Sequence, residues 1–183
     1  MKNFALALSL LLVSICTQAA EYKRVDISAS QIRFTSRQMG VPVEGAFRKF
    51  DASLAFDPEA PSAARGQLRI DLSSIDTGVR EVDEEVVGAH WFDVKRHPDA
   101  RFEMRQILSQ GGERFQISGA LNLKGVTQPV VLNAVLKRSA SQAVMEGSFV
   151  IKRLDFGVGG GAWGDVKIVA NEVTVQFHLV LRP

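Results

Sequence analysis

Residues 173–181 read Val-Thr-Val-Gln-Phe-His-Leu-Val-Leu, and this stretch decides the fold class. Successive side chains of a β-strand point to opposite faces, so every second residue shares a face. Here one face is apolar throughout and consists of Val173, Val175, Phe177, Leu179 and Leu181. This alternation predicts a strand with one face in a hydrophobic core.

The same alternation recurs at seven places earlier in the chain. These segments are 32–34, 50–56, 68–72, 102–104, 115–123, 130–136 and 145–151. Turn signals such as Asp57-Pro58, Gly111-Gly112 and Gln128-Pro129 separate them. About eight strands at this spacing predict an all-β antiparallel sandwich or barrel and argue against βαβ units.

One segment follows a different period. Val79, Val82 and Val86 fall at helical spacing, and charged residues face the other way. Asp76 or Thr77 could cap the start, and Gly88 could end the helix. The pattern predicts one amphipathic helix of about three turns that lies over an opening or an edge of the sheet.

The N-terminus has the features of a secretory signal peptide. Lys2 precedes an apolar run at 4–15, and the small residues of 17–20 favour cleavage after Ala19, with Ala20 as the alternative. We therefore expect a signal peptide at 1–19 and one β domain at 20–183, exported to the periplasm. Cleavage would remove Cys16, the single cysteine, so the mature chain would have no disulfide and no thiolate ligand.

The charge balance and the hydropathy of the sequence limit the kinds of partner that we expect. The chain has 22 Lys and Arg against 20 Asp and Glu, without a basic stripe, so we expect no nucleic-acid binding. The apolar run at 4–15 is too short for a bilayer, which takes roughly 20 residues, and no later run approaches that length. We expect no integral membrane segment in the mature chain.

No catalytic or metal motif stands out. His90 and His97 lie seven residues apart without the His-x-x-x-His spacing of a metal helix, and there is no Gly-x-Ser-x-Gly elbow. The glycine-rich run at 157–161 has no βαβ context. It predicts either a flexible connection between the last two strands or a bulge where the sheet curves, with Trp163 packing over a barrel mouth. We expect no enzyme activity, no metal and no cofactor.

Apolar side chains are the remaining functional candidates. The sequence has 11 phenylalanines and one tyrosine. A small barrel of about eight strands either fills its interior with side chains or holds one small ligand, and periodicity does not separate the two outcomes. If the interior is open, the predicted lining residues are Phe34, Phe47, Phe56, Leu68, Phe102, Phe115, Leu121 and Phe149.

A series of short motifs runs through nearly the whole of residues 21–183. They are Ser30-x-Ile32-x-Phe34, Gly45-Ala46-Phe47, Phe50-Asp51, Ser74-Ile75-Asp76-Thr77-Gly78, Trp91-Phe92-Asp93, Pro98 with Phe102, Gly119-x-Leu121-x-Leu123-x-Gly125-Val126-Thr127-x-Pro129-Val130, Arg153-x-Asp155-Phe156-Gly157 and Asn171-Glu172-Val173. In the order and spacing of these motifs the chain resembles the YceI-like family of exported, lipocalin-like barrels associated with polyisoprenoid binding.

The chain departs from the family pattern at the predicted helix. Many members carry Arg-Asp-x-His-Leu there, whereas this chain has Val82-Asp83-Glu84-Glu85-Val86. Trp91 also stands where a phenylalanine is commoner. Any contact that the missing arginine and histidine make to a head group therefore does not carry over.

The resemblance implies non-enzymatic binding or carriage of a long-chain amphiphile, such as a polyisoprenoid, an isoprenoid quinone or a fatty-acyl lipid. Two alternatives stay open: a solid-core interaction or stress-protective protein, and a quinone-handling partner of a membrane b-type cytochrome, which the family also suggests. An incompletely closed barrel could in addition form a homodimer through its edge strands.

Overall fold

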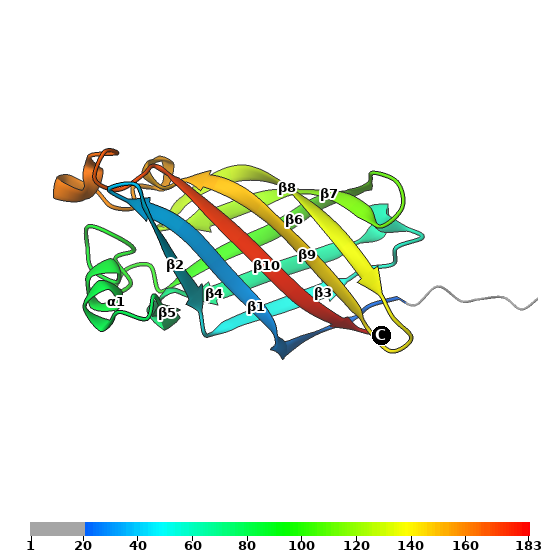
Figure 1. Ribbon diagram of the computed structural model, residues 1–183. Coiled ribbons are helices and arrows are strands. Elements are labelled where there is room, and N and C mark those ends of the chain that lie inside the picture. The colour runs from blue at the N-terminus through cyan, green and yellow to red at the C-terminus, as the bar shows by residue number, and fades with distance from the viewer. Residues whose placement is uncertain (1–20) are drawn as a thin grey trace, which may run out of the picture.

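Residues 21–183 form a single curled antiparallel sheet with one short helix in the computed structural model (Figure 1). The predicted signal peptide at 1–19 lies outside the described residues. The strands are β1 Arg24–Gln38, β2 Val41–Phe47, β3 Phe50–Ala55, β4 Arg65–Asp71, β5 Ile75–Asp76, β6 Asp99–Ser109, β7 Arg114–Leu123, β8 Val126–Arg138, β9 Ala143–Lys152 and β10 Glu172–Arg182. Their order in the sheet is β3-β4-β6-β7-β8-β9-β10-β1-β2-β5.

The predicted all-β antiparallel, lipocalin-like architecture is confirmed, but the expected number of about eight strands was too low. The described residues contain ten strands, and the alternation pattern had missed β2 and β5. Pro42 and Gly45 interrupt the apolar pattern of β2, and β5 is only two residues long. Such segments pair because their neighbours hold them in register, so a local pattern does not reveal them.

Strand β1 curls the sheet. It pairs with β10 on one side and β2 on the other, and its register with β10 shifts between Asp26 and Gln31. The buried Ser30 stabilises this bulge: its hydroxyl donates to the Asp26 carbonyl at 2.7 Å and accepts from the Val180 amide at 2.9 Å. Because a bulge bends its strand, β1 can follow the curvature of the barrel.

A short bridge brings the N-terminal segment against the far edge of the sheet. The Tyr22 amide donates to the Phe56 carbonyl at 2.8 Å, and the Phe56 amide donates back to the Tyr22 carbonyl at 2.9 Å. Both rings are buried, at 4% and 0% exposure. This bridge draws the barrel together at the end that carries both termini of the described chain (Figure 1).

Helix α1, Arg80–Val86, is shorter than the predicted three turns and starts later. Neither Asp76 nor Thr77 caps it. Thr77 instead donates its amide and its hydroxyl to Asp83 Oδ1, at 2.9 and 2.7 Å. Thr77 thus orders the loop before the helix. None of the helices within 21–183 has the length and hydropathy needed to cross a bilayer.

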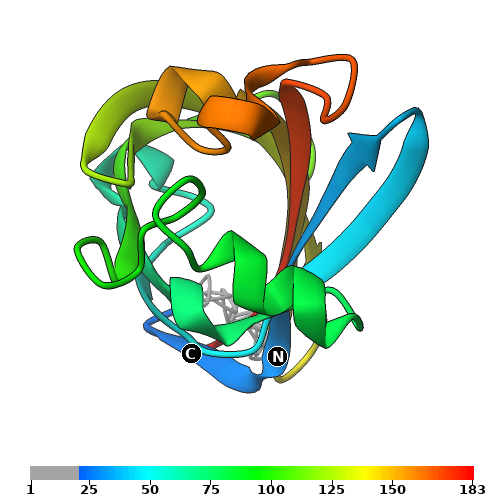
Figure 2. The same ribbon diagram turned by 90° about the vertical axis from the view of Figure 1, so that its left-hand side faces the viewer.

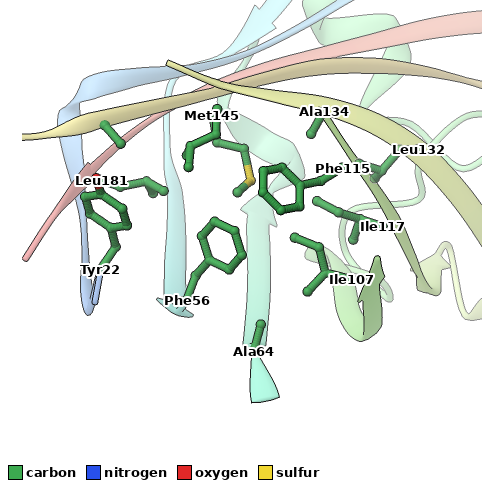
Figure 3. Packing of buried hydrophobic residues seen from close by; sticks show 12 residues of the cluster. Tyr22, Phe56, Ala64, Ile107, Phe115, Ile117, Leu132, Ala134, Met145 and Leu181 are labelled. Carbon is green, nitrogen blue, oxygen red and sulfur yellow. The ribbon is translucent and has the colours of Figure 1, made fainter. Parts of the chain in front are cut away.

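The two ends of the barrel differ in their packing. We call the end near both termini the packed end, where a cluster of buried side chains fills the interior (Figure 3). We call the opposite end the mouth. It carries the β1–β2 turn, α1 and the β9–β10 connection, and Figure 2 looks directly at it.

Candidate functional site

The interior of the barrel toward the mouth is hollow. A cavity of about 440 Å³ lies between the curled sheet and α1, and apolar side chains make up nearly all of its wall. This size is within the range of ligand pockets, about 300–1,000 Å³. The solid-core alternative therefore does not describe this half of the molecule.

Six of the eight predicted lining residues face this cavity: Phe34, Phe47, Leu68, Phe102, Leu121 and Phe149. The other two, Phe56 and Phe115, do not line it. Their rings pack edge to face at 5.3 Å and 88° inside the packed end. Alternation identifies an inward face, but it does not tell where along the barrel the interior changes from filled to hollow. Contact of the six with a ligand stays a prediction.

Glycines explain how so many phenylalanines leave room inside. Phe34 stands opposite Gly45, and Phe177 stands opposite Gly147, in antiparallel register. A β-carbon at either glycine would collide with the ring of its partner phenylalanine, and one at Gly119 would collide with the Phe102 ring. The rings therefore occupy the space that a side chain on the next strand would otherwise fill. This arrangement keeps the centre of the barrel open.

Aromatic rings continue along one wall toward the helix. Phe34 and Phe47 have ring centroids 5.6 Å apart, and Phe47 and Phe92 are 6.3 Å apart. All three line the cavity. Phe92 follows α1 in the chain, so this contact ties the helical segment to the strands β1 and β2.

Arg153 anchors the β9–β10 connection, which consists of residues 153–171. Its side chain is buried and donates five hydrogen bonds, all to backbone carbonyls of this connection: Val158, Gly159, Trp163, Val169 and Ala170, at 2.7–3.0 Å. Its guanidinium also stacks 5.7 Å from the Trp91 ring centre. Burial lowers the pKa of Arg153, but arginine stays charged in proteins. With every N–H engaged, Arg153 serves as a structural anchor.

A hydrogen bond between Trp163 and Glu85, which we call the latch, joins the two sides of the mouth. The Trp163 indole N–H donates to Glu85 Oε1 of α1 at 2.9 Å, and its ring lies 5.6 Å from that of Trp91. Both tryptophans line the cavity, in agreement with the predicted position of Trp163 over a barrel mouth. The Trp91 indole nitrogen is buried and has no hydrogen-bond partner among the described residues.

The charges at the mouth differ from those that the family pattern implied. Val82 and Glu85 occupy the positions of the missing arginine and histidine, and both line the cavity, as does Glu81. The nearby Lys124 donates its Nζ to the carbonyls of Ala89 and Gly157, at 3.1 and 2.8 Å. Burial lowers the pKa of Lys124. The mouth therefore offers carboxylates on α1, while Lys124 already has backbone partners.

None of the three histidines belongs to a cluster of potential metal ligands within the described residues. Within 21–183, no three His, Cys, Asp or Glu side chains gather as a metal site would require. His178 sits on the outer face of β10, where its Nδ1 lies 3.0 Å from Glu146 Oε1. A Lys137 Nζ contact and this histidine lower the pKa of Glu146.

The comparison with protein families decides the relationship. A model of the YceI-like domain matches residues 24–181, which is nearly all of the described chain. The chain belongs to the YceI-like family. Among curated relatives, a UPF0312 protein of Photorhabdus laumondii is 32% identical over 157 residues, which cover 81% of each chain. One of Azotobacter vinelandii is 35% identical over 120 residues, and this match spans 62% of each chain.

Solved structures share the YceI-like fold. BcnA of Burkholderia cenocepacia superposes with a TM-score of 0.84 at 38% identity, over 86% of this chain and 99% of that one. A polyisoprenoid binding domain from Saccharophagus degradans gives a TM-score of 0.70 at 21% identity, over 89% and 99%. At that identity the second likeness concerns the fold alone.

Sequence reasoning missed part of the YceI-like cavity wall. It did not identify Phe92, Val86 or the contact between Glu85 and Trp163 as parts of one mouth. These residues lie on segments that are far apart in sequence and irregular in structure, so periodicity carries no signal for them. The signal that was available is the pair of tryptophans, which are the only two in the sequence.

Proposed function

We propose that this protein binds one long-chain amphiphile, with its apolar tail inside the cavity and its polar head at the mouth. One observation carries the proposal: an apolar cavity of about 440 Å³ inside the barrel. The YceI-like family and a structural neighbour described as a polyisoprenoid binding domain support a prenyl tail. An isoprenoid quinone and a fatty-acyl lipid are further candidates with the same tail chemistry.

Burial of the tail is sufficient to drive such binding. At roughly 25 cal/mol per Å², removing about 500 Å² of apolar tail from water contributes about 12 kcal/mol. Lost translation and side-chain ordering take back several kcal/mol or more. The balance favours binding without any charged contact. Because methylene groups differ little from one another, the cavity selects tail length and bulk more strongly than chemical identity.

We further propose that the protein acts as a carrier in the periplasm after removal of residues 1–19. The N-terminal sequence supports export, since it has a basic start, an apolar run and small residues before the β domain. N-terminal sequencing of the protein recovered from the periplasm tests this part. A first residue of Ala20 or Glu21 is expected, and recovery of intact Met1 from the cytoplasm would contradict it.

The binding function is tested by native mass spectrometry of freshly purified protein, followed by organic extraction. We expect a bound species whose extract contains a prenyl or acyl chain. If a quinone is recovered, the partnership with a membrane b-type cytochrome gains support. If the protein is empty and also takes up neither geranylgeraniol nor hexadecanol, the proposed function is wrong.

A pair of variants separates the cavity from the rest of the surface. Ala52→Trp places a large ring on the cavity wall, whereas Val131→Trp places the same ring on the outer face of β8. We expect Ala52→Trp to weaken uptake of geranylgeraniol by at least about tenfold, or about 1.4 kcal/mol. Val131→Trp should bind as the unmodified protein does. Equal binding by both variants would place the ligand outside the cavity.

A further inference from the structure

Four exposed apolar side chains gather beside the mouth. Met39 is 72% exposed, Val41 63%, Val166 52% and Ile168 38%. We call these four residues the lip. A soluble protein scatters single apolar residues over its surface, but a group of this kind beside a pocket is typical of an interaction site.

Backbone contacts hold the lip together, although its residues come from two distant segments. The Met39 amide donates to the Ile168 carbonyl at 2.8 Å, and the Ala170 amide donates to the Arg37 carbonyl at 2.9 Å. Gln38 and Val169 form an antiparallel bridge between these two contacts. These contacts therefore hold the β1–β2 turn against the β9–β10 connection, and Figure 2 shows both at the mouth.

The lip is continuous with the wall of the cavity. Gln38 and Val169 line the cavity, and their chain neighbours Met39 and Ile168 belong to the lip. The lip therefore meets the cavity wall at this edge, through the apolar Val169 and the polar Gln38. A tail that left a bilayer at the lip would enter the cavity across these two residues.

Charge separates the lip from the other side of the mouth. Arg37 and Lys167 flank the lip, and the one carboxylate within 165–168, Asp165, accepts a hydrogen bond from the Lys167 amide at 2.8 Å. The opposite side is α1, whose carboxylates are Glu81, Asp83, Glu84 and Glu85 against Arg80 alone. An anionic bilayer attracts basic residues beside an apolar patch and repels acidic ones.

We propose that the lip docks on the surface of a lipid bilayer, with α1 turned away, and that the ligand enters and leaves there. This inference rests on the proposed function, because a membrane-derived tail gives the lip its occupant. The lip lies directly beside the entrance, and its basic flank matches the anionic surface of a membrane.

The unmodified protein offers a direct test. The only two tryptophans of the sequence, Trp91 and Trp163, lie at the mouth. Vesicles of phosphatidylcholine and phosphatidylglycerol whose acyl chains carry bromine near the head group should quench the tryptophan fluorescence. Unbrominated vesicles of the same composition are the control. Binding without quenching would mean that the mouth does not face the bilayer, and it would overturn the proposal.

A matched pair of double variants locates the contact. Val41→Glu with Ile168→Glu changes two lip residues that are 63% and 38% exposed. Val131→Glu with Val135→Glu changes two residues of the outer β8 face that are 59% and 39% exposed. Both variants add two negative charges, and both leave the N-terminal segment unchanged. In a flotation assay we expect the lip variant to lose at least about tenfold in vesicle partitioning, and the β8 variant to lose about threefold or less.

Equal partitioning of the two double variants would overturn the proposal. So would a wild-type dimer in solution that the lip variant converts to a monomer, since the lip would then bind a second copy. Uptake of geranylgeraniol from dilute solution distinguishes a failure of the docking proposal from a failure of the proposed binding function. If the wild-type protein takes up the alcohol but ignores vesicles, docking alone fails, whereas loss of alcohol uptake contradicts the proposed function itself.

Discussion

The two ends of the barrel use the same kinds of side chain for opposite purposes. At the packed end, Phe56 and Phe115 meet edge to face in the centre, and Phe56 and Leu181 are completely buried. Toward the mouth, the rings of Phe34 and Phe102 lie over glycines of neighbouring strands, and the centre stays open. Residue type alone therefore does not distinguish a core from a binding site. The residue that a ring meets on the neighbouring strand makes the difference.

This difference assigns stability to one end and binding to the other. The packed end buries its apolar groups against each other, and the Tyr22–Phe56 bridge adds two backbone hydrogen bonds. The cavity wall leaves much of its apolar surface for a ligand to cover. Mutations at the two ends should consequently affect different measurements.

The largest effect is expected from truncating a ring at the packed end. Phe56→Ala should destabilise the protein by about 3–5 kcal/mol, since it removes a fully buried aromatic side chain. Phe34→Ala on the cavity wall should cost about 1–2 kcal/mol, because its ring is only partly buried. Urea unfolding followed by circular dichroism measures both. Equal losses would contradict the division between the two ends.

Enlarging a side chain should also affect stability differently at the two ends of the barrel. Ala134→Trp forces a ring into the filled cluster and should destabilise the protein by about 2–3 kcal/mol. The cavity-filling Ala52→Trp should change the unfolding free energy by less than about 1 kcal/mol, since it enters empty space. Thermal and urea unfolding of the two variants, side by side, check this. A large loss in Ala52→Trp would mean that the cavity does not accept volume.

The latch at the mouth should matter for exchange more than for stability. Glu85→Leu removes the carboxylate that accepts from the Trp163 indole, a hydrogen bond whose net contribution is about 0.5–1.5 kcal/mol. We expect ligand release to accelerate about threefold or more, while the unfolding free energy falls by no more than about 1.5 kcal/mol. Stopped-flow transfer of a fluorescent prenyl alcohol to acceptor vesicles measures the rate. Glu84→Leu, which loses only the Arg80 contact on α1, is the control and should keep the original rate.

The smallest effect is expected in the loss of stability at acid pH. The Arg96 side chain that donates to Asp93 holds the pKa of this carboxyl near the mouth below its ordinary value, which is that of the unfolded chain. The stabilising contact is therefore fully present above that unfolded-state value and is lost as the pH falls through the lower folded pKa. Asp93→Asn should reduce the drop in urea midpoint between pH 5 and pH 2.5. An unchanged drop in this variant would show that other carboxyls control acid stability. Asparagine tolerates the left-handed backbone at this position, where φ is 52°.

Local alternation was enough to predict the architecture and most of the inward faces. It identified eight of the ten described strands, all except β2 and β5, and placed Phe102, Leu121 and Phe149 on the inside. It could not show that Phe56 and Phe115 belong to the packed end, because their position along the barrel depends on the register between distant strands. Alternation also could not predict that five backbone carbonyls surround the Arg153 side chain. Those acceptors are backbone atoms of an irregular segment. Because every residue has the same backbone carbonyl, the sequence does not show which carbonyls accept a hydrogen bond.

The positions of the chain ends have a practical consequence. Tyr22, next to the first described residue, and Arg182, next to the last, both lie at the packed end, where the Lys23 amide donates to the Arg182 carbonyl at 3.0 Å (Figure 1). A sensor chip that captures the protein through a tag after Pro183 would present every molecule in one orientation, with the mouth toward the flowing sample. The same geometry allows a fluorescent reporter to be fused at the C-terminus without obstructing the entrance.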